Sequence, residues 1–232
     1  MGSAVRHTPV EAILLTDAEL DHTLGVVLLR EARHLPLYAT AAVRYILESD
    51  SRLLPVTRAF SDVPVTTLPM ETLVPLEYGD GSSSGLAVKA FEVPAGPPRF
   101  ASREETGHTI GFMVHELASG SVCAFVPGCG ALDVALTDRL AEADAVLFDG
   151  TFWSDDELIA LGVGTRTARE LDHLPIAGPG GSLERLAALP CRHRIYTHIN
   201  NTNPILLEHS NERAEVDHAG IVVGFDGLRL NL

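Results

Sequence analysis

The chain has 232 residues and 46% hydrophobic content, which is enough to bury the core of one domain over residues 1–232. Its 17 basic and 31 acidic side chains give a formal net charge of −14, which argues against nucleic acid and anionic membrane surfaces as partners. No apolar run approaches a membrane span of roughly 20 residues, and no signal peptide opens the chain, so we expect a cytoplasmic protein.

The N-terminal region concentrates acidic side chains in one predicted turn. Residues 10–15 have the pattern of a short buried strand, and residues 24–30 that of the start of an apolar helix. The turn between them holds three carboxylates and one imidazole, from Asp17, Glu19, Asp21 and His22. Carboxylates this close repel one another, and a bound divalent cation would offset the repulsion. Acidic residues that favour a helix N-terminus are the alternative explanation.

Strand and helix patterns alternate through the middle of the chain, which predicts an α/β fold. The further strands expected here cover residues 35–40, 63–69, 75–78, 86–93, 109–117 and 121–126. The helices expected cover residues 41–49 and 131–143, and residues 51–61 form a loop with helical tendency. The second helix leads to a buried strand at 145–148, which Asp149 follows directly. Asp149 is therefore a candidate metal ligand, an acceptor for a ligating His, or a simple turn residue.

The last predicted strand, residues 191–199, ends in a segment rich in polar side chains. The sequence T-H-I-N-N-T-N-P over residues 197–204 sets an imidazole and three carboxamides around a chain reversal, because Pro204 cannot continue a ladder. Strand ends of this kind are where α/β domains place chemistry. This predicts a functional site at His198, with Asn200, Asn201 and Asn203 beside it. His173, in a turn-rich stretch, is either a substrate contact or a surface residue.

Taken together, these segments resemble a known family. Residues 17–22 have the spacing of the H-x-H-x-D-H motif of the metallo-β-lactamase fold, with Asp17 and Glu19 in place of the first two His and with Asp21 and His22 retained. With the segment around His198 and G-T-F-W at residues 150–153, the set is similar to that of the coenzyme PQQ synthesis protein B family. The resemblance runs from residue 7 to residue 227. It implies an α/β fold of metallo-β-lactamase-like αββα sandwich type.

In that family, a further N-terminal segment carries the first strands and a Cys-rich zinc motif. Here the chain starts almost at the first motif strand, and its Cys residues are too scattered to form such a motif, at Cys123, Cys129 and Cys191. We therefore expect an N-terminally shortened sandwich that lacks part of one sheet. A misassigned start, a split gene and a shortened homologue would each explain the difference.

The candidate ligands limit the chemistry. Asp21, His22 and His198 combine two imidazoles with one carboxylate, the composition of the facial triad in non-haem Fe(II) oxygenases. Fe(II) is therefore favoured, although the same donors bind Zn or Mn, and O2 would be the co-substrate. The candidates to complete the metal site are Asp17, Glu19 and Asp149.

The resemblance implies the reaction, which is iron-dependent hydroxylation of the tyrosine ring of a peptide-derived Glu-Tyr precursor in pyrroloquinoline quinone (PQQ) synthesis. In this interpretation Asn200, Asn201 and Asn203 orient the ligands or bind carboxylates of the precursor, and His173 is a further substrate-binding residue. The partners expected are this precursor and other PQQ-pathway proteins, and the sequence is compatible with a homodimer. Two other function classes stay open. One is a carrier of PQQ or its precursor to the periplasm, and the other is a metal-dependent hydrolase of the metallo-β-lactamase type.

Overall fold

The computed structural model describes residues 8–232, so His7, where the resemblance starts, lies outside the described residues. The chain forms two compact units. The first unit comprises Met1–Glu92 and Gly96–Ile110, and the second comprises Val93–Ala95 and Gly111–Leu232. None of the helices in the described part of the chain has the length and apolarity that a membrane span requires.

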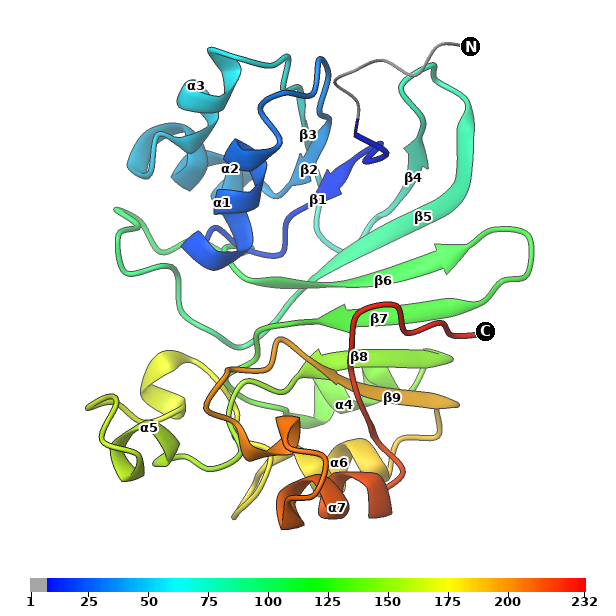
Figure 1. The fold of residues 1–232 in the computed structure, drawn as a ribbon. Helices are drawn as coiled ribbons and strands as arrows, with labels where there is room; N and C mark the ends of the chain where they lie inside the picture. The colour runs from blue at the N-terminus through cyan, green and yellow to red at the C-terminus, as the bar shows by residue number, and fades with distance from the viewer. Residues whose placement is uncertain (1–7) are drawn as a thin grey trace. The chain divides into compact units, whose positions relative to one another are not determined.

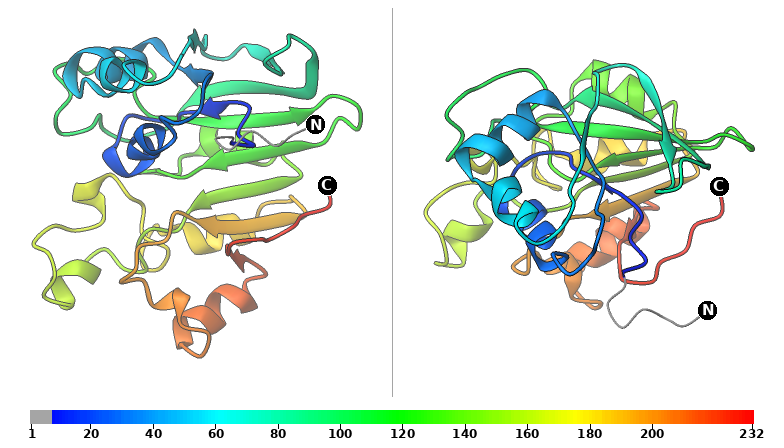
Figure 2. Two further views of the ribbon diagram at one scale, coloured as in Figure 1. Left: turned by 45° about the horizontal axis from the view of Figure 1, so that its top comes forward. Right: turned by 90° about the horizontal axis from the view of Figure 1, so that it is seen from above.

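A small parallel sheet organises the first unit. Its strands lie in the order β1-β2-β3 and cover Ile13–Leu14, Leu37–Ala39 and Val65–Thr67. Three helices lie together beside it (Figure 1), namely α1 Leu20–Leu28, α2 Ala41–Tyr45 and α3 Leu53–Arg58. The views in Figure 2 show the same grouping in blue and cyan. One buried core joins these elements, and its members include Leu15, Leu37, Val43, Leu47 and Leu54.

The rest of the first unit is a π-helical turn and a hairpin. The turn, Ile46–Asp50, joins α2 to α3. In the hairpin, β4 Leu73–Glu77 pairs antiparallel with β5 Ser83–Glu92. The connection between these strands falls in the Gly- and Ser-rich tract at residues 79–85, where Gly81 and Gly85 have positive φ angles of 82° and 79°. These angles suit Gly, which explains the composition of the tract.

A mostly parallel sheet organises the second unit. Within this unit the strands run in the order β10-β9-β8-β7-β6, which is part of the longer order that ends in β5-β4. They cover Val222–Val223, His193–Thr197, Ala145–Asp149, Val122–Val126 and Ile110–Glu116. Only the pair β6–β7 is antiparallel among these neighbours. The connecting helices are α4 Val134–Leu140, α5 Glu157–Ala160, α6 Ser182–Ala187 and α7 Asn211–His218, with short 3-10 turns at Arg169–Leu171 and Pro204–Leu206. Large side chains fill the interior, among them Leu140, Phe148, Leu186, Ile195 and Tyr196.

Parallel pairing brings the ends of three strands to one edge of this sheet. The register places Val126 opposite Phe148, and Asp149 opposite Thr197. The segments that follow β7, β8 and β9 therefore start side by side, and they carry Cys129, Thr151 and His198. Only Gly fits at residue 150, since a Cβ there would lie 2.8 Å from the Cβ of Tyr196.

Sequence-based predictions and structure differ at the ends of some elements. Helix α1 begins at Leu20 rather than at residue 24, so Asp21 and His22 lie in its first turn and not in a loop before it. The carboxylate of Asp17 accepts the N–H of Glu19 at 2.9 Å, which satisfies a donor at the helix start. Strand β9 stops before residue 199, because His198 has a left-handed backbone with φ of 53°.

Candidate metal centre

In the first unit, a buried carboxylate holds His22. Asp17 is 3% exposed, and its two oxygens lie 2.8 and 2.7 Å from Nδ1 of His22. The hydroxyl of Thr16 donates to the same carboxylate at 2.8 Å. An ionised carboxylate can only accept, so the neutral His22 ring carries its proton on Nδ1. The lone pair is then on Nε2, as in metal-binding His residues whose other nitrogen donates to a carboxylate.

Negative charge surrounds this imidazole. Burial disfavours the charged form of both partners, but the hydrogen bond to His22 lowers the pKa of Asp17 and the same bond raises the pKa of His22. Partial burial and the charges of Asp17 and Asp21 raise the pKa of Glu19. The exposed Asp21 places Oδ2 3.9 Å from Nε2 of His22. The turn is therefore an environment that favours a cation.

The Asp17–His22 pair predicts a pH window for the stability of the metal-free protein. The lowered pKa of Asp17 gives stability that is present above the unfolded value of 3.8 and is lost as acid protonates the carboxylate. The raised pKa of His22 gives stability that is complete below the unfolded value of 6.5 and is lost as the pH rises through the folded pKa. The contribution of the pair to the free energy of unfolding should thus be largest between about pH 4 and pH 6.5.

Urea denaturation of the metal-free protein and of His22→Gln, at pH values from within this window to well above it, measures the contribution. The variant should lose the part of the alkaline decline that belongs to His22. A variant with the same alkaline decline as the parent would contradict the assignment.

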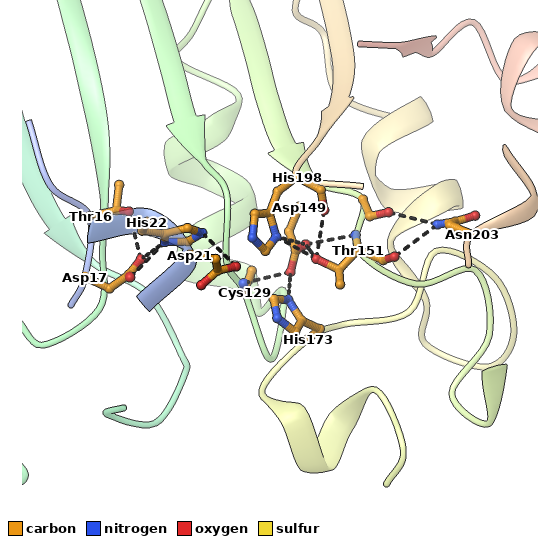
Figure 3. Close-up of polar contacts among 11 residues, drawn as sticks. Thr16, Asp17, Asp21, His22, Cys129, Asp149, Thr151, His173, His198 and Asn203 are labelled. Carbon is orange, nitrogen blue, oxygen red and sulfur yellow. Dashed lines mark hydrogen bonds and ion pairs between the residues drawn. The ribbon is translucent and has the colours of Figure 1, made fainter. Parts of the chain in front are cut away.

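In the second unit, Asp149 is the centre of a hydrogen-bonded cluster (Figure 3). This carboxylate has no exposed surface. Its Oδ2 accepts the N–H of Cys129 at 3.0 Å and lies 2.7 Å from Nδ1 of His173. Its Oδ1 accepts the N–H of Thr151 at 3.0 Å and the hydroxyl of Thr151 at 2.5 Å. Burial alone would raise the pKa of Asp149, but His173 and His198 lower it to about 2.

The same carboxylate orients two imidazoles. His173 points Nδ1 at Asp149, and His198 places Nδ1 2.7 Å from the hydroxyl of Thr151 and 3.7 Å from Oδ1 of Asp149. The two rings stack, with centroids 5.4 Å apart. Donor atoms of the three residues Asp149, His173 and His198 lie within 4.8 Å of one another, so this group could hold a metal ion. Nδ1 of His173 is bonded to Asp149, so Nε2 is the nitrogen that His173 could offer to an ion.

Hydrogen bonds from two Asn residues fix the loop that carries His198. The backbone N–H of Asn200 donates to the carbonyl of Thr151 at 3.1 Å. Asn203, which is 2% exposed, donates to the carbonyl of Gly150 at 2.9 Å and accepts the N–H of Ile205 at 3.1 Å. A non-Gly residue in the left-handed region costs on the order of 1 kcal/mol or more and needs such support. These bonds therefore support a backbone conformation of His198 that is disfavoured for a non-Gly residue.

A buried glutamate ties the same loop to the segment after β8. Glu157 accepts the hydroxyl of Thr202 at 2.5 Å and the N–H of Trp153 at 2.6 Å. The side chain of Asn200 donates to the Thr202 hydroxyl at 2.6 Å. These contacts give Asn200 a supporting role in the loop, as Asn203 has, while Asn201 is exposed. Binding of the precursor by the three Asn residues stays a prediction.

Each unit thus assembles part of the predicted site. The first unit brings together Asp17, Glu19, Asp21 and His22, and the second unit brings together Asp149, His173 and His198. The binding of one ion by Asp21, His22 and His198 stays a prediction. The sequence analysis missed Thr151 and Glu157 as supporting residues. The only sequence feature that could have indicated Thr151 is its position two residues after Asp149 at a strand end. No sequence feature indicated Glu157.

Comparison with known proteins agrees with this arrangement. A model of the β-lactamase superfamily domain matches residues 2–199. Coenzyme PQQ synthesis protein B from Methylobacterium nodulans is 44% identical over an alignment of 236 residues, and the alignment covers 98% of this chain and 75% of that protein. The protein of the same name from Cupriavidus taiwanensis is 42% identical over an alignment of 237 residues, and the alignment covers 99% of this chain and 75% of that protein. The chain belongs to the coenzyme PQQ synthesis protein B family.

A solved structure supports the same assignment. The crystal structure of Zn(2+)-bound PqqB from Methylobacterium extorquens has a TM-score of 0.86 and 38% sequence identity, and it covers 100% of this chain and 76% of that chain. The predicted family and the predicted metallo-β-lactamase fold are therefore confirmed.

Proposed function

We propose that this protein acts in PQQ synthesis as an iron-dependent hydroxylase of the tyrosine ring of a Glu-Tyr precursor. The observation that carries the proposal is the support of three imidazoles through Nδ1. His22 is bonded to Asp17, His173 to Asp149, and His198 to the Thr151 hydroxyl. Supporting hydrogen bonds of this kind fix the orientation of metal-binding His residues. The names of the relatives, and the zinc in the PqqB structure, support PQQ synthesis and a divalent metal.

The donor set fits a divalent ion. In the proposed site, Asp21, His22 and His198 would hold the ion, and His173 and Asp149 stand beside His198. Two imidazoles with a carboxylate suit Fe(II), and Zn or Mn would bind the same donors. When bound, iron would supply the capacity to react with O2, which the side chains alone lack.

The overall reaction balances with a two-electron reductant such as ascorbate. One atom of O2 replaces the hydrogen of a ring C–H bond as a hydroxyl group, and the other atom leaves as water. The reductant supplies two electrons, and two protons are taken up. The carboxylates of Asp17 and Asp149 accept the Nδ1 protons of the neutral His22 and His173 rings, so Nε2 of His22 is the nitrogen that would bind the ion.

The test combines metal loading with isotope-labelled O2. The metal-free protein is loaded with Fe(II) without air and then receives a Glu-Tyr peptide, ascorbate and labelled O2. We expect label in the hydroxylated ring, and loss of that product in Asp21→Ala, His22→Ala and His198→Ala. His34→Ala is the matched control, because His34 also pairs with a carboxylate, Asp62 at 2.7 Å, at a site where both side chains are largely exposed.

Three outcomes would overturn the proposal. The same product without O2 would exclude an oxygenase reaction. Full activity with Zn(II) alone, or cleavage of an ester or lactam, would favour a hydrolase of the metallo-β-lactamase type. Binding of PQQ or its precursor without turnover under any metal would favour a carrier.

A further inference from the structure

A single hydroxyl stands between Asp149 and His198. Oγ1 of Thr151 lies 2.5 Å from Oδ1 of Asp149, 2.7 Å from Nδ1 of His198 and 2.9 Å from the carbonyl oxygen of His198. Thr151 is 6% exposed, so water does not compete freely for these contacts. Figure 3 draws Thr151 beside both residues, with dashed lines for its contacts.

The number of protons determines the direction of these hydrogen bonds. A hydroxyl has one hydrogen to donate, and an ionised carboxylate has none. The Asp149 carboxylate and the His198 carbonyl can only accept, so the one hydroxyl hydrogen serves these two oxygens. The contact between Oγ1 and Nδ1 of His198 then needs a proton from the imidazole. A neutral His198 with its proton on Nδ1 has its lone pair on Nε2.

We propose that Thr151 is a positioning residue that fixes the Nδ1–H tautomer of His198 and so selects Nε2 as its metal-binding nitrogen. The choice of tautomer follows from the contacts within the second unit. The effect on metal binding rests on the function proposed above. The Thr151 hydroxyl thus connects the Asp149 carboxylate to His198. His173, by contrast, is bonded to the same carboxylate directly.

The backbone of Thr151 is held independently of its hydroxyl. Its N–H donates to Asp149, and its carbonyl accepts from the N–H of Asn200 at 3.1 Å. A β-branched side chain also has few χ1 rotamers, which favours a fixed hydroxyl. Removal of the hydroxyl alone should therefore leave the segment in place. Thr151→Val is close in shape and makes that change, and Thr151→Ser restores the hydroxyl.

The tautomer can be read without metal. Two-bond proton–nitrogen NMR spectra of the metal-free protein distinguish Nδ1–H from Nε2–H imidazoles, and His198→Gln assigns the His198 signals. We expect the Nδ1–H form in the parent and in Thr151→Ser, and a shift towards Nε2–H in Thr151→Val. His22, whose tautomer is set by Asp17, is an internal control that should not change. Unchanged far-UV circular dichroism would show that the variants fold.

Zn(II) binding, measured by competition with a chelator, gives the second measurement. Loss of a supporting hydrogen bond lowers metal affinity by roughly 10- to 100-fold, so we expect a loss in this range for Thr151→Val and recovery in Thr151→Ser. An unchanged tautomer of His198 in Thr151→Val would overturn the inference. A changed tautomer with unchanged Zn(II) affinity would keep the role of Thr151 and instead count against His198 as a ligand in the proposed function.

Discussion

Replacing Asp149 by Ala is expected to lower the free energy of unfolding by about 3 to 5 kcal/mol, the range for removal of one partner from a buried ionic pair. The change would leave the N–H groups of Cys129 and Thr151, and Nδ1 of His173, without their acceptor, a carboxylate that has no exposed surface. It would also remove the group that orients His173 and, through Thr151, His198. Metal affinity should therefore fall together with stability.

Asp149→Asn is the matched variant. Its side chain has the same shape, but an amide nitrogen donates where the carboxylate accepted, so it would face one of the donors. It should recover packing but not the lost hydrogen bonds, and urea denaturation of the three proteins measures both effects. Stability equal to that of the parent in Asp149→Asn would contradict a charged acceptor at this position.

The parent and Asp149→Asn should also differ in how much stability they lose at low pH. The folded pKa of Asp149 is about 2, below the ordinary value of 3.8, so the carboxylate contributes about 2 kcal/mol that is present above pH 3.8. This contribution is lost as the pH falls through about 2. Asp149→Asn should lack this part of the acid-induced loss. An equal loss in the variant would place the acid sensitivity in another group.

Much of the second unit was predictable because its chemistry follows the strand pattern. Four apolar residues before Asp149, and the strand that leads to His198, put both at the ends of parallel neighbours. Strands that pair in parallel place their carboxyl ends at one edge, so proximity follows from the fold class. Helix α1 was harder, because Asp17 satisfies the N–H of Glu19 from outside the helix and the apolar pattern does not record that bond.

The supporting residues could not be predicted in the same way. Glu157 lies in a stretch with other acidic residues, and nothing in its neighbours indicates that its carboxylate is buried. Its partner Thr202 is 45 residues further along the chain. The predicted precursor-binding role of Asn203 illustrates the same limit, since a carboxamide can bind either a ligand or the backbone. Only its contacts with Gly150 and Ile205 indicate a supporting role.

Loss of metal binding in His22→Ala and in His198→Ala is the second large effect expected. If these residues hold one ion with Asp21, as the sequence predicts, each substitution removes a ligand rather than a support. The loss of affinity should then exceed the roughly 10- to 100-fold that follows from loss of a supporting hydrogen bond. Titration of each metal-free variant with Zn(II) and with Fe(II), the latter without air, measures it. The control His34→Ala should bind like the parent.

The double variant decides whether the two imidazoles serve the same ion. Ligands of one ion act as a unit, so removal of the second should add little once the first is gone, and the two effects should be strongly non-additive. Ligands of two separate ions would give additive losses and a parent stoichiometry of two. Such additivity would contradict a shared site, and with it the facial triad of Asp21, His22 and His198. Non-additive loss from a stoichiometry of one is the result expected if both His residues bind the same ion, because the first substitution then already removes most of the affinity.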